Sequence, residues 1–126
     1  ENHKNMSQLS DAECQEELMK VHNKVKELTG VEMNLFRPPY GRIKKSQIKR
    51  IKTLVPNIQI IMWDVLSGDF DLSLSPDACF QNVIRHTENG SIIVFHDSLK
   101  AFARLKHALP LALDYFIKQG YRFETL

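Results

Sequence analysis

Four stretches of the chain repeat apolar residues at the three- and four-residue spacing of an amphipathic helix. The pattern predicts helices over residues 10–29, 42–55, 76–86 and 102–119, the last broken or restarted at Pro110. The first helix has the clearest start, because Ser10 and Glu13 have the spacing of a capping box. Thr29-Gly30 then ends its apolar repeat.

Short apolar runs fall between the predicted helices. They predict strands over residues 33–36, 58–63, 91–95 and 121–124, with a polar loop over residues 64–75. Helices and strands then alternate strictly, four of each, which is typical of a parallel sheet covered by helices. A closed barrel of eight such units needs roughly 250 residues. The 126 residues would supply about half of one.

Composition is that of an ordinary globular domain, with 43% hydrophobic and 25% charged residues. No run approaches the roughly 18 apolar residues of a membrane-spanning helix, and no signal-peptide pattern opens the chain, which leaves localisation undecided. A net charge of +2 gives no reason to expect a polyanionic partner. The basic run over residues 42–52 could grip phosphates in an α/β interaction domain, but a solvated helix face explains it better and no nucleic acid is expected.

Cys14 and Cys79 are too few and too far apart for a disulfide framework or a metal knuckle. Each falls on the apolar phase of a predicted helix. Both are therefore expected to be buried thiols.

Chemically capable side chains gather just after the predicted strands. Arg37 to Tyr40 follow the first strand, residues 64–71 the second, and His96-Asp97-Ser98 the third. In parallel α/β folds this end of the sheet carries ligand-binding and catalytic residues.

Each of these residues also has a plain structural explanation. His96 can transfer protons near neutral pH, or it can be a hydrogen-bonded structural histidine. Arg37, followed by two prolines, can clamp a carboxylate bidentately or lie on the surface beside a turn. The acids of the polar loop can be metal ligands, acceptors for a histidine, or loop caps: Asp64, Asp69 and Asp71.

Three motifs taken together resemble NodB-type polysaccharide deacetylases, carbohydrate esterase family 4. They are Arg37-Pro-Pro-Tyr-Gly41, Trp63 with Asp69-Phe70, and the segment Gly90-Ser-Ile-Ile-Val-Phe-His96-Asp97. The start of the chain, with His3, is similar to the tail of the second motif of that family. The resemblance implies a distorted (β/α) barrel, of which residues 1–126 would be a single, incomplete C-terminal portion.

The same resemblance implies site roles. A divalent metal, commonly zinc, would be held by His3 and by ligands upstream of this chain, where the catalytic aspartate would also lie. His96 would be the general acid, the Tyr40 backbone N–H would stabilise the oxyanion, and Arg37 would orient the catalytic aspartate. Asp69 would orient His96 or Arg37.

Two departures from the family pattern bear on the substrate. Leu66 and Phe70 stand where the family's fourth motif usually has an aspartate and a tryptophan, so the aromatic wall of the sugar groove would be smaller. Val94 replaces the common leucine in the pocket for the acetyl methyl group. Trp63, Phe70, Val94 and Tyr40 are thus the predicted substrate contacts.

The expected function is removal of acetyl groups from N- or O-acetylated polysaccharide, such as chitin-like glycan or peptidoglycan, by the whole protein. The chain by itself is expected to be inactive, because a single histidine cannot hold zinc. The alternative is a glycan-binding or regulatory relative without catalysis. The family suggests a cell-envelope location, and an incomplete barrel suggests self-association through its open edge.

Overall fold

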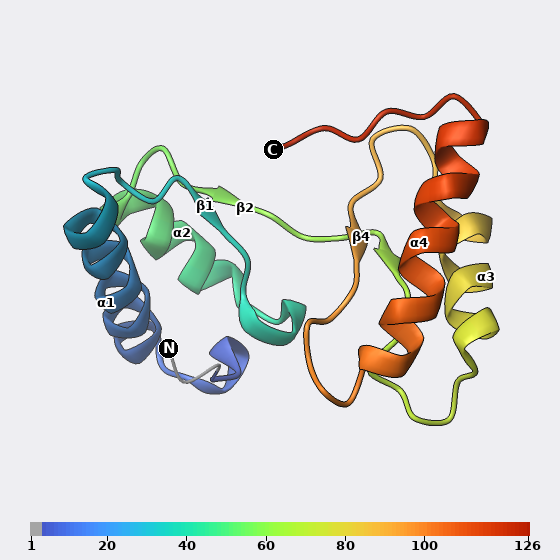
Figure 1. Ribbon diagram of the computed structural model, residues 1–126. Helices are drawn as coiled ribbons and strands as arrows, with labels where there is room; N and C mark the ends of the chain where they lie inside the picture. Colours follow the sequence, from blue (N-terminus) through green and yellow to red (C-terminus); the bar gives the residue numbers. More distant parts are fainter. Residues whose placement is uncertain (1–3) are drawn as a thin grey trace. The chain divides into compact units, whose positions relative to one another are not determined.

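The computed structural model describes residues 4–126, which divide into two compact units, one ending at Met62 and one running from Trp63 to Leu126. Each unit contains two parallel strands joined through a helix (Figure 1). This strand-helix-strand arrangement is the repeating unit of the barrel folds that the sequence predicts.

The first unit pairs β1 with β2, with Leu35 opposite Gln59. In chain order its elements are the 3-10 turn η1 (Met6–Gln8), α1 (Asp11–Thr29), β1 (Leu35–Phe36), η2 (Pro39–Gly41), α2 (Lys45–Leu54) and β2 (Gln59–Ile60). The two strands are shorter than the apolar runs that predict them, because only residues with a hydrogen-bonded neighbour form a ladder.

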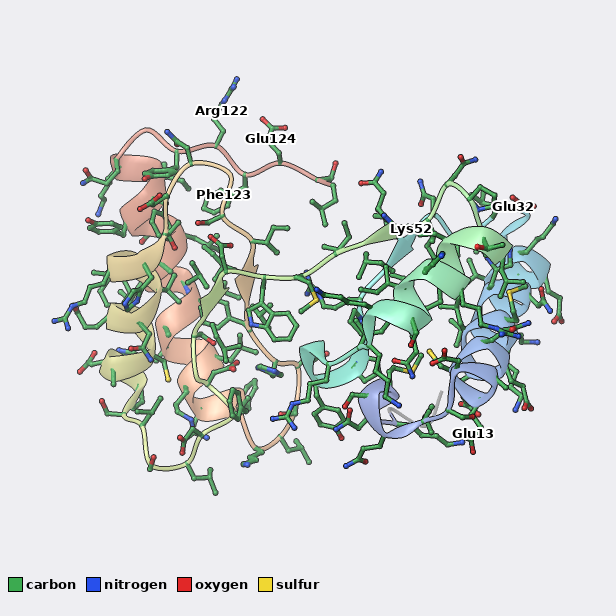
Figure 2. All side chains as sticks on the ribbon, turned by 180° about the vertical axis from the view of Figure 1, so that it is seen from behind. Glu13, Glu32, Lys52, Arg122, Phe123 and Glu124 are labelled. Carbon is green, nitrogen blue, oxygen red and sulfur yellow. The ribbon has the colours of Figure 1, made fainter. Side chains whose placement is uncertain are left out.

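The α1 helix begins and ends as the sequence predicts. The Ser10 Oγ accepts from the Glu13 backbone N–H at 3.2 Å, and the Glu13 carboxylate accepts from the Ser10 N–H at 2.8 Å. The hydrogen bonds that Ser10 donates to this carboxylate, first the one from its backbone N–H and then the one from its hydroxyl, lower the pKa of Glu13. Figure 2 shows Glu13 at this end of α1. Gly30 ends the helix in the left-handed conformation, with φ of 72°.

The core of the first unit lies between α1, α2 and β2. Its buried apolar side chains are Met6, Cys14, Leu18, Ile51, Val55 and Ile58. One buried polar side chain, Gln47, crosses from α2 to the η1 segment, donating to the Met6 carbonyl at 2.8 Å and the Leu9 carbonyl at 3.1 Å. Its own oxygen accepts from the Lys44 N–H at 2.9 Å. All these polar atoms are therefore satisfied in the core.

The second unit pairs β3 with β4 and packs two helices beside them. Its elements are β3 (Val65–Leu66), α3 (Pro76–His86), β4 (Ile93–Val94) and α4 (Phe102–Lys118). Ser75 caps α3 by accepting from the Ala78 N–H at 3.1 Å, which confirms the predicted helix start. Val65, Val83, Ala112 and Phe116 form the buried core of this unit.

The α4 helix is continuous, so the predicted break at Pro110 is wrong. Pro110 is exposed, while Ala108 and Ala112 on either side of it are buried. The proline removes one backbone donor. Packing of the opposite face of the helix on α3 and the core compensates for that loss.

Two strand assignments differ from the prediction. Val65–Leu66 lies in the expected polar loop but forms β3, because Ser67 N–H and Val65 N–H reach the carbonyls of Val94 and Ile92. Residues 121–124 are not a strand in the structure. These residues alternate in polarity, but they pair with no neighbouring strand among residues 4–126. Alternation alone does not form a sheet.

Within the described residues, no helix is both long enough and apolar enough to cross a membrane.

Candidate functional site

The register of β3 and β4 brings two predicted site residues to the same end of the second unit. Val65 lies opposite Ile93 and Leu66 opposite Val94 in a parallel pair. Asp69 follows β3 by three residues and His96 follows β4 by two. Because parallel strands end on the same side, the two side chains emerge together.

Asp69 and His96 form a two-point contact. The His96 Nδ1 lies 2.7 Å from one carboxylate oxygen, and the His96 backbone N–H donates to the other, also at 2.7 Å. A carboxylate only accepts, so Nδ1 carries the proton in this contact. The Asp69 side chain is fully buried, while 39% of the His96 side chain is exposed. This leaves Nε2 as the ring nitrogen that Asp69 does not engage.

The loop that presents Asp69 is held at its backbone. Gly68 adopts φ of 79°, and a Cβ atom there would lie 2.6 Å from the Leu74 side chain. Asn82 of α3 donates to the Ser67 carbonyl at 3.1 Å. Arg104 of α4 donates through Nε to the Asp69 carbonyl at 2.6 Å. The position of the Asp69 carboxylate thus depends on contacts from two helices.

The two other acids of the loop, Asp64 and Asp71, accept hydrogen bonds from residues other than His96. Asp64 accepts from the Ser91 hydroxyl at 2.6 Å and from the Ile92 N–H at 2.7 Å, and these bonds, that of Ser91 first, lower its pKa. Asp71 caps a turn by accepting from the N–H and hydroxyl of Ser73, which lowers its pKa. Of the three alternatives for these acids, Asp69 is the acceptor for a histidine and Asp71 is a loop cap.

The predicted substrate contacts of the second unit lie around His96. The Phe70 ring meets the His96 ring edge-on, with centroids 5.0 Å apart and an interplanar angle of 70°. Val94 is half-buried in β4, two residues before His96, and Trp63 is half-buried two residues before β3. Their roles toward a sugar remain a prediction.

The Arg37-Pro-Pro-Tyr-Gly41 motif follows β1 in the first unit. Arg37 donates to the Ile61 carbonyl at 3.4 Å. Tyr40 is the one non-glycine residue among residues 4–126 with a positive φ, 57°. A left-handed conformation at a bulky residue costs about 1–3 kcal/mol and is enriched at functional sites. The strain falls on the residue whose backbone N–H is predicted to stabilise the oxyanion.

The predicted metal ligand, His3, lies outside the described residues. Residues 4–126 contain no group of three histidine, cysteine or acidic side chains that could hold a metal ion. Arg37 and Tyr40 belong to the first unit, and Asp69 and His96 to the second. The convergence of these residues with His3 on one cavity stays a prediction.

Both cysteines are buried thiols, as predicted. Burial is the main cause that raises the pKa of the Cys14 and Cys79 thiols. A raised pKa leaves less of the nucleophilic thiolate, so neither is a candidate nucleophile.

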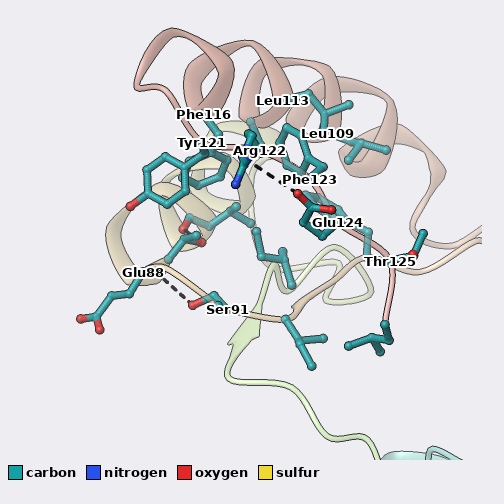
Figure 3. A pocket seen from close by; sticks show the side chains of 18 residues that line it. Glu88, Ser91, Leu109, Leu113, Phe116, Tyr121, Arg122, Phe123, Glu124 and Thr125 are labelled. Carbon is teal, nitrogen blue, oxygen red and sulfur yellow. Dashed lines mark hydrogen bonds and ion pairs between the residues drawn. The ribbon is translucent and has the colours of Figure 1, made fainter. Parts of the chain in front are cut away.

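A cavity of about 580 Å³ lies in the second unit (Figure 3). Its lining comes from α3, β4, α4 and the last residues of the chain, with Arg122 and Glu124 3.9 Å apart. Most of the lining is apolar, including Phe95, Phe116 and Phe123. None of the predicted site residues that the structure describes lines it, and His96 and Asp69 are not among its lining residues.

Three residues that support the loop were missed in the sequence: Ser67, Asn82 and Arg104. Arg104 carried a usable signal, because it interrupts the buried stripe of α4 formed by Ala101, Ala108, Ala112 and Phe116. A charged residue on the buried stripe of a helix indicates a specific polar partner.

Sequence comparison gives one family and several relatives. The family described as polysaccharide deacetylase matches residues 1–55. A peptidoglycan-N-acetylglucosamine deacetylase of Bacillus cereus is 30% identical over 128 residues, covering 98% of this chain and 44% of the relative. A peptidoglycan-N-acetylmuramic acid deacetylase of Bacillus subtilis is 27% identical over 127 residues, covering 98% of this chain and 46% of the relative, so the chain spans just under half the length of each of these two relatives.

Solved structures agree with this family. A peptidoglycan N-acetylglucosamine deacetylase in complex with a hydroxamate-type benzamide matches with a TM-score of 0.88 and 26% identity, covering 99% of this chain and 57% of that one. A family 4 carbohydrate esterase pseudoenzyme from Bacillus anthracis matches with a TM-score of 0.80 and 26% identity, covering 96% and 41%. The predicted fold class, part of a barrel built from helices and short parallel strands, is confirmed.

Proposed function

This chain matches the polysaccharide deacetylases, carbohydrate esterase family 4, in sequence and in fold, and on that premise we propose that the whole protein is a glycan deacetylase. The observation that carries the proposal is the contact between the buried Asp69 carboxylate and the partly exposed His96 imidazole. This is the arrangement of an oriented histidine that exchanges a proton with a reacting group.

The reaction is hydrolysis of an acetamide. Water adds to the acetyl carbonyl, the bond from carbonyl carbon to nitrogen breaks, and acetate and a free amine form. The amine nitrogen leaves poorly as an anion, so it must receive a proton as the bond breaks. His96 in its doubly protonated form gives that proton from Nε2 and becomes neutral, while Asp69 accepts from Nδ1–H and thereby sets the direction of the ring.

The first unit contributes the remaining polar groups of this chain. The Tyr40 N–H donates to the oxygen that becomes negative when water adds. The rigid Pro38-Pro39 segment and the strained φ at Tyr40 fix the direction of that donor. Arg37 orients the catalytic aspartate that the resemblance implies, and the carboxylate of that aspartate accepts a proton from the attacking water.

A divalent metal, zinc, belongs to the proposal for the whole protein, with His3 as one ligand. When bound, the metal would polarise the acetyl carbonyl and make a bound water more acidic.

The substrate proposed is an N-acetylated glycan of the cell envelope, peptidoglycan first. The Bacillus cereus and Bacillus subtilis relatives are both named as peptidoglycan deacetylases, which supports this class and a location outside the cytoplasm. In this proposal Trp63 and Phe70 would offer aromatic faces to a sugar ring, and Val94 would contact the acetyl methyl group. Self-association through the open edges of the two-stranded sheets is also proposed.

Acetate release from the full-length protein tests the proposal. Peptidoglycan and an N-acetylated chitooligosaccharide are supplied with and without a chelator, alongside a His96→Ala variant. We expect acetate release that the chelator abolishes and that His96→Ala lowers by about 10²–10⁴-fold. Equal activity of the wild type and His96→Ala would contradict the assigned role of His96.

A second candidate function is glycan binding without catalysis. The pseudoenzyme from Bacillus anthracis, which matches this chain with a TM-score of 0.80, supports it. A binding module would retain peptidoglycan in a pull-down and release no acetate at any metal concentration.

A further inference from the structure

Arg104 is a buried cation placed behind the His96–Asp69 contact. It lies in the first turn of α4, and the residue is 8% exposed. Its Nε donates to the Asp69 carbonyl and one terminal nitrogen donates to the Lys100 carbonyl, both at 2.6 Å. Both acceptors are backbone oxygens, so the guanidinium ties the Asp69 loop to the start of the helix that follows His96.

Burying a guanidinium is costly unless its charge and its donors are compensated. The two carbonyl oxygens accept hydrogen bonds from the Arg104 guanidinium, but they do not neutralise its positive charge. Asp69 takes part in two contacts, since its carbonyl accepts from Arg104 and its buried carboxylate accepts from His96. Asp69 thus connects the Arg104 guanidinium to the His96 imidazole.

The loop around Asp69 is also held by hydrogen bonds at neighbouring residues. The Ser67 carbonyl is held by Asn82, and the Asp69 N–H donates to the Ser67 hydroxyl at 3.3 Å. Gly68, between them, adopts a positive φ of 79°, which glycine tolerates better than other residues, and its carbonyl accepts from the Asp71 N–H at 2.9 Å. Arg104 therefore holds the Asp69 carbonyl directly, whereas Asn82 acts on the loop two residues earlier, at the Ser67 carbonyl.

We propose that Arg104 is a positioning residue for the deacetylation reaction: it fixes the backbone of Asp69 so that the carboxylate can orient His96 Nδ1. This proposal rests on the proposed function. A purely structural Arg104 would affect folding stability and leave the imidazole of the folded protein unchanged.

The test uses the full-length protein with Arg104→Met and Arg104→Lys, and Arg85→Met as the control. Arg85 is an exposed arginine at the end of α3 in the same unit. Lysine keeps the charge but cannot donate to both carbonyls in the fork geometry of arginine. The two readouts are the kinetics of acetate release and the NMR signal of the His96 Nδ1–H proton, assigned by its loss in His96→Gln.

We expect Arg104→Met to lower kcat by about 10–100-fold with little change in KM, since misplacement of a catalytic group by about 1 Å costs up to about 100-fold. The Nδ1–H signal should shift or exchange away in Arg104→Met and move less in Arg104→Lys. Arg85→Met should keep both readouts at the wild-type value.

Unchanged kcat and an unchanged Nδ1–H signal in folded Arg104→Met would overturn the proposal. If that variant does not fold, an unchanged signal and kcat in Arg104→Lys overturn it equally. If the wild type releases no acetate but the Nδ1–H signal moves in Arg104→Lys, the proposed function fails while the positioning of His96 by Arg104 stands.

Discussion

The Nδ1 atom of His96 lies 2.7 Å from the Oδ1 atom of Asp69, whose side chain is fully buried. The backbone N–H of the same histidine donates to the other oxygen of that carboxylate. Asp69 therefore controls both the rotation of the imidazole and its tautomer.

Asp69→Asn should damage catalysis more than binding. An amide presents one acceptor and one donor, so it cannot accept from both His96 groups, and the ring turns or changes tautomer. We expect kcat for acetate release to fall by about 10²–10⁴-fold in the full-length protein, with KM nearly unchanged. Asp97→Asn is the matched control, because Asp97 is exposed and adjoins His96. Equal losses in the two variants would argue against a specific role for Asp69.

Gly68→Ala should destabilise the second unit more than Gly90→Ala. Both glycines have a positive φ, 79° and 85°, which costs alanine about 1–2 kcal/mol. At Gly68 the new Cβ also meets the Leu74 side chain at 2.6 Å, whereas nothing lies within 4 Å at Gly90. Overpacking adds about 1–3 kcal/mol, measured as the difference in free energy of unfolding in urea. Identical values would show that the loop relaxes without cost.

Protonation of Asp64 should contribute to the loss of folding stability at acidic pH. Its pKa is lowered in the folded protein by hydrogen bonds from Ser91 and Ile92, so its contribution is full above the ordinary carboxyl pKa. The contribution is lost as the pH falls through the lowered value. Asp64→Asn should flatten the fall in unfolding free energy between neutral pH and acid, measured by urea titration at each pH.

Ser91→Ala provides the companion variant for Asp64. It removes the largest cause of the lowered pKa and should move the acid transition to higher pH. An acid dependence of Asp64→Asn that matches the wild type would show that other carboxylates govern it.

Gln47→Leu should destabilise the first unit although leucine is the more apolar residue. The change leaves the Met6 carbonyl and the Lys44 N–H without the partners that Gln47 provides. Leaving buried polar groups unsatisfied costs about 1–3 kcal/mol. Gln59→Leu, at an exposed position in β2, should change the free energy of unfolding by about 0.5 kcal/mol or less. Thermal unfolding of both variants measures the difference.

Structural features that depend on residues close together in the chain could be predicted from the sequence. The capping box of Ser10 and Glu13 and the Ser75-Pro76 start of α3 both predict helices that the structure contains. Caps form between residues at most four positions apart, so the sequence determines them directly. The motif ending at His96 likewise identified a histidine that lies at the end of a strand.

Tertiary structure decided what depends on distant partners. The local pattern did not distinguish the three acids of this loop, and the family resemblance left His96 and Arg37 as alternative partners of Asp69. The pairing of β3 with β4 brings Asp69, and not Asp64 or Asp71, to the His96 ring. The same pairing made Val65–Leu66 a strand, and the contact of Arg104 with Asp69 joins residues 35 positions apart. A strand and a buried ion are stable only with their partners in place, and a linear pattern does not specify which distant residue that partner is.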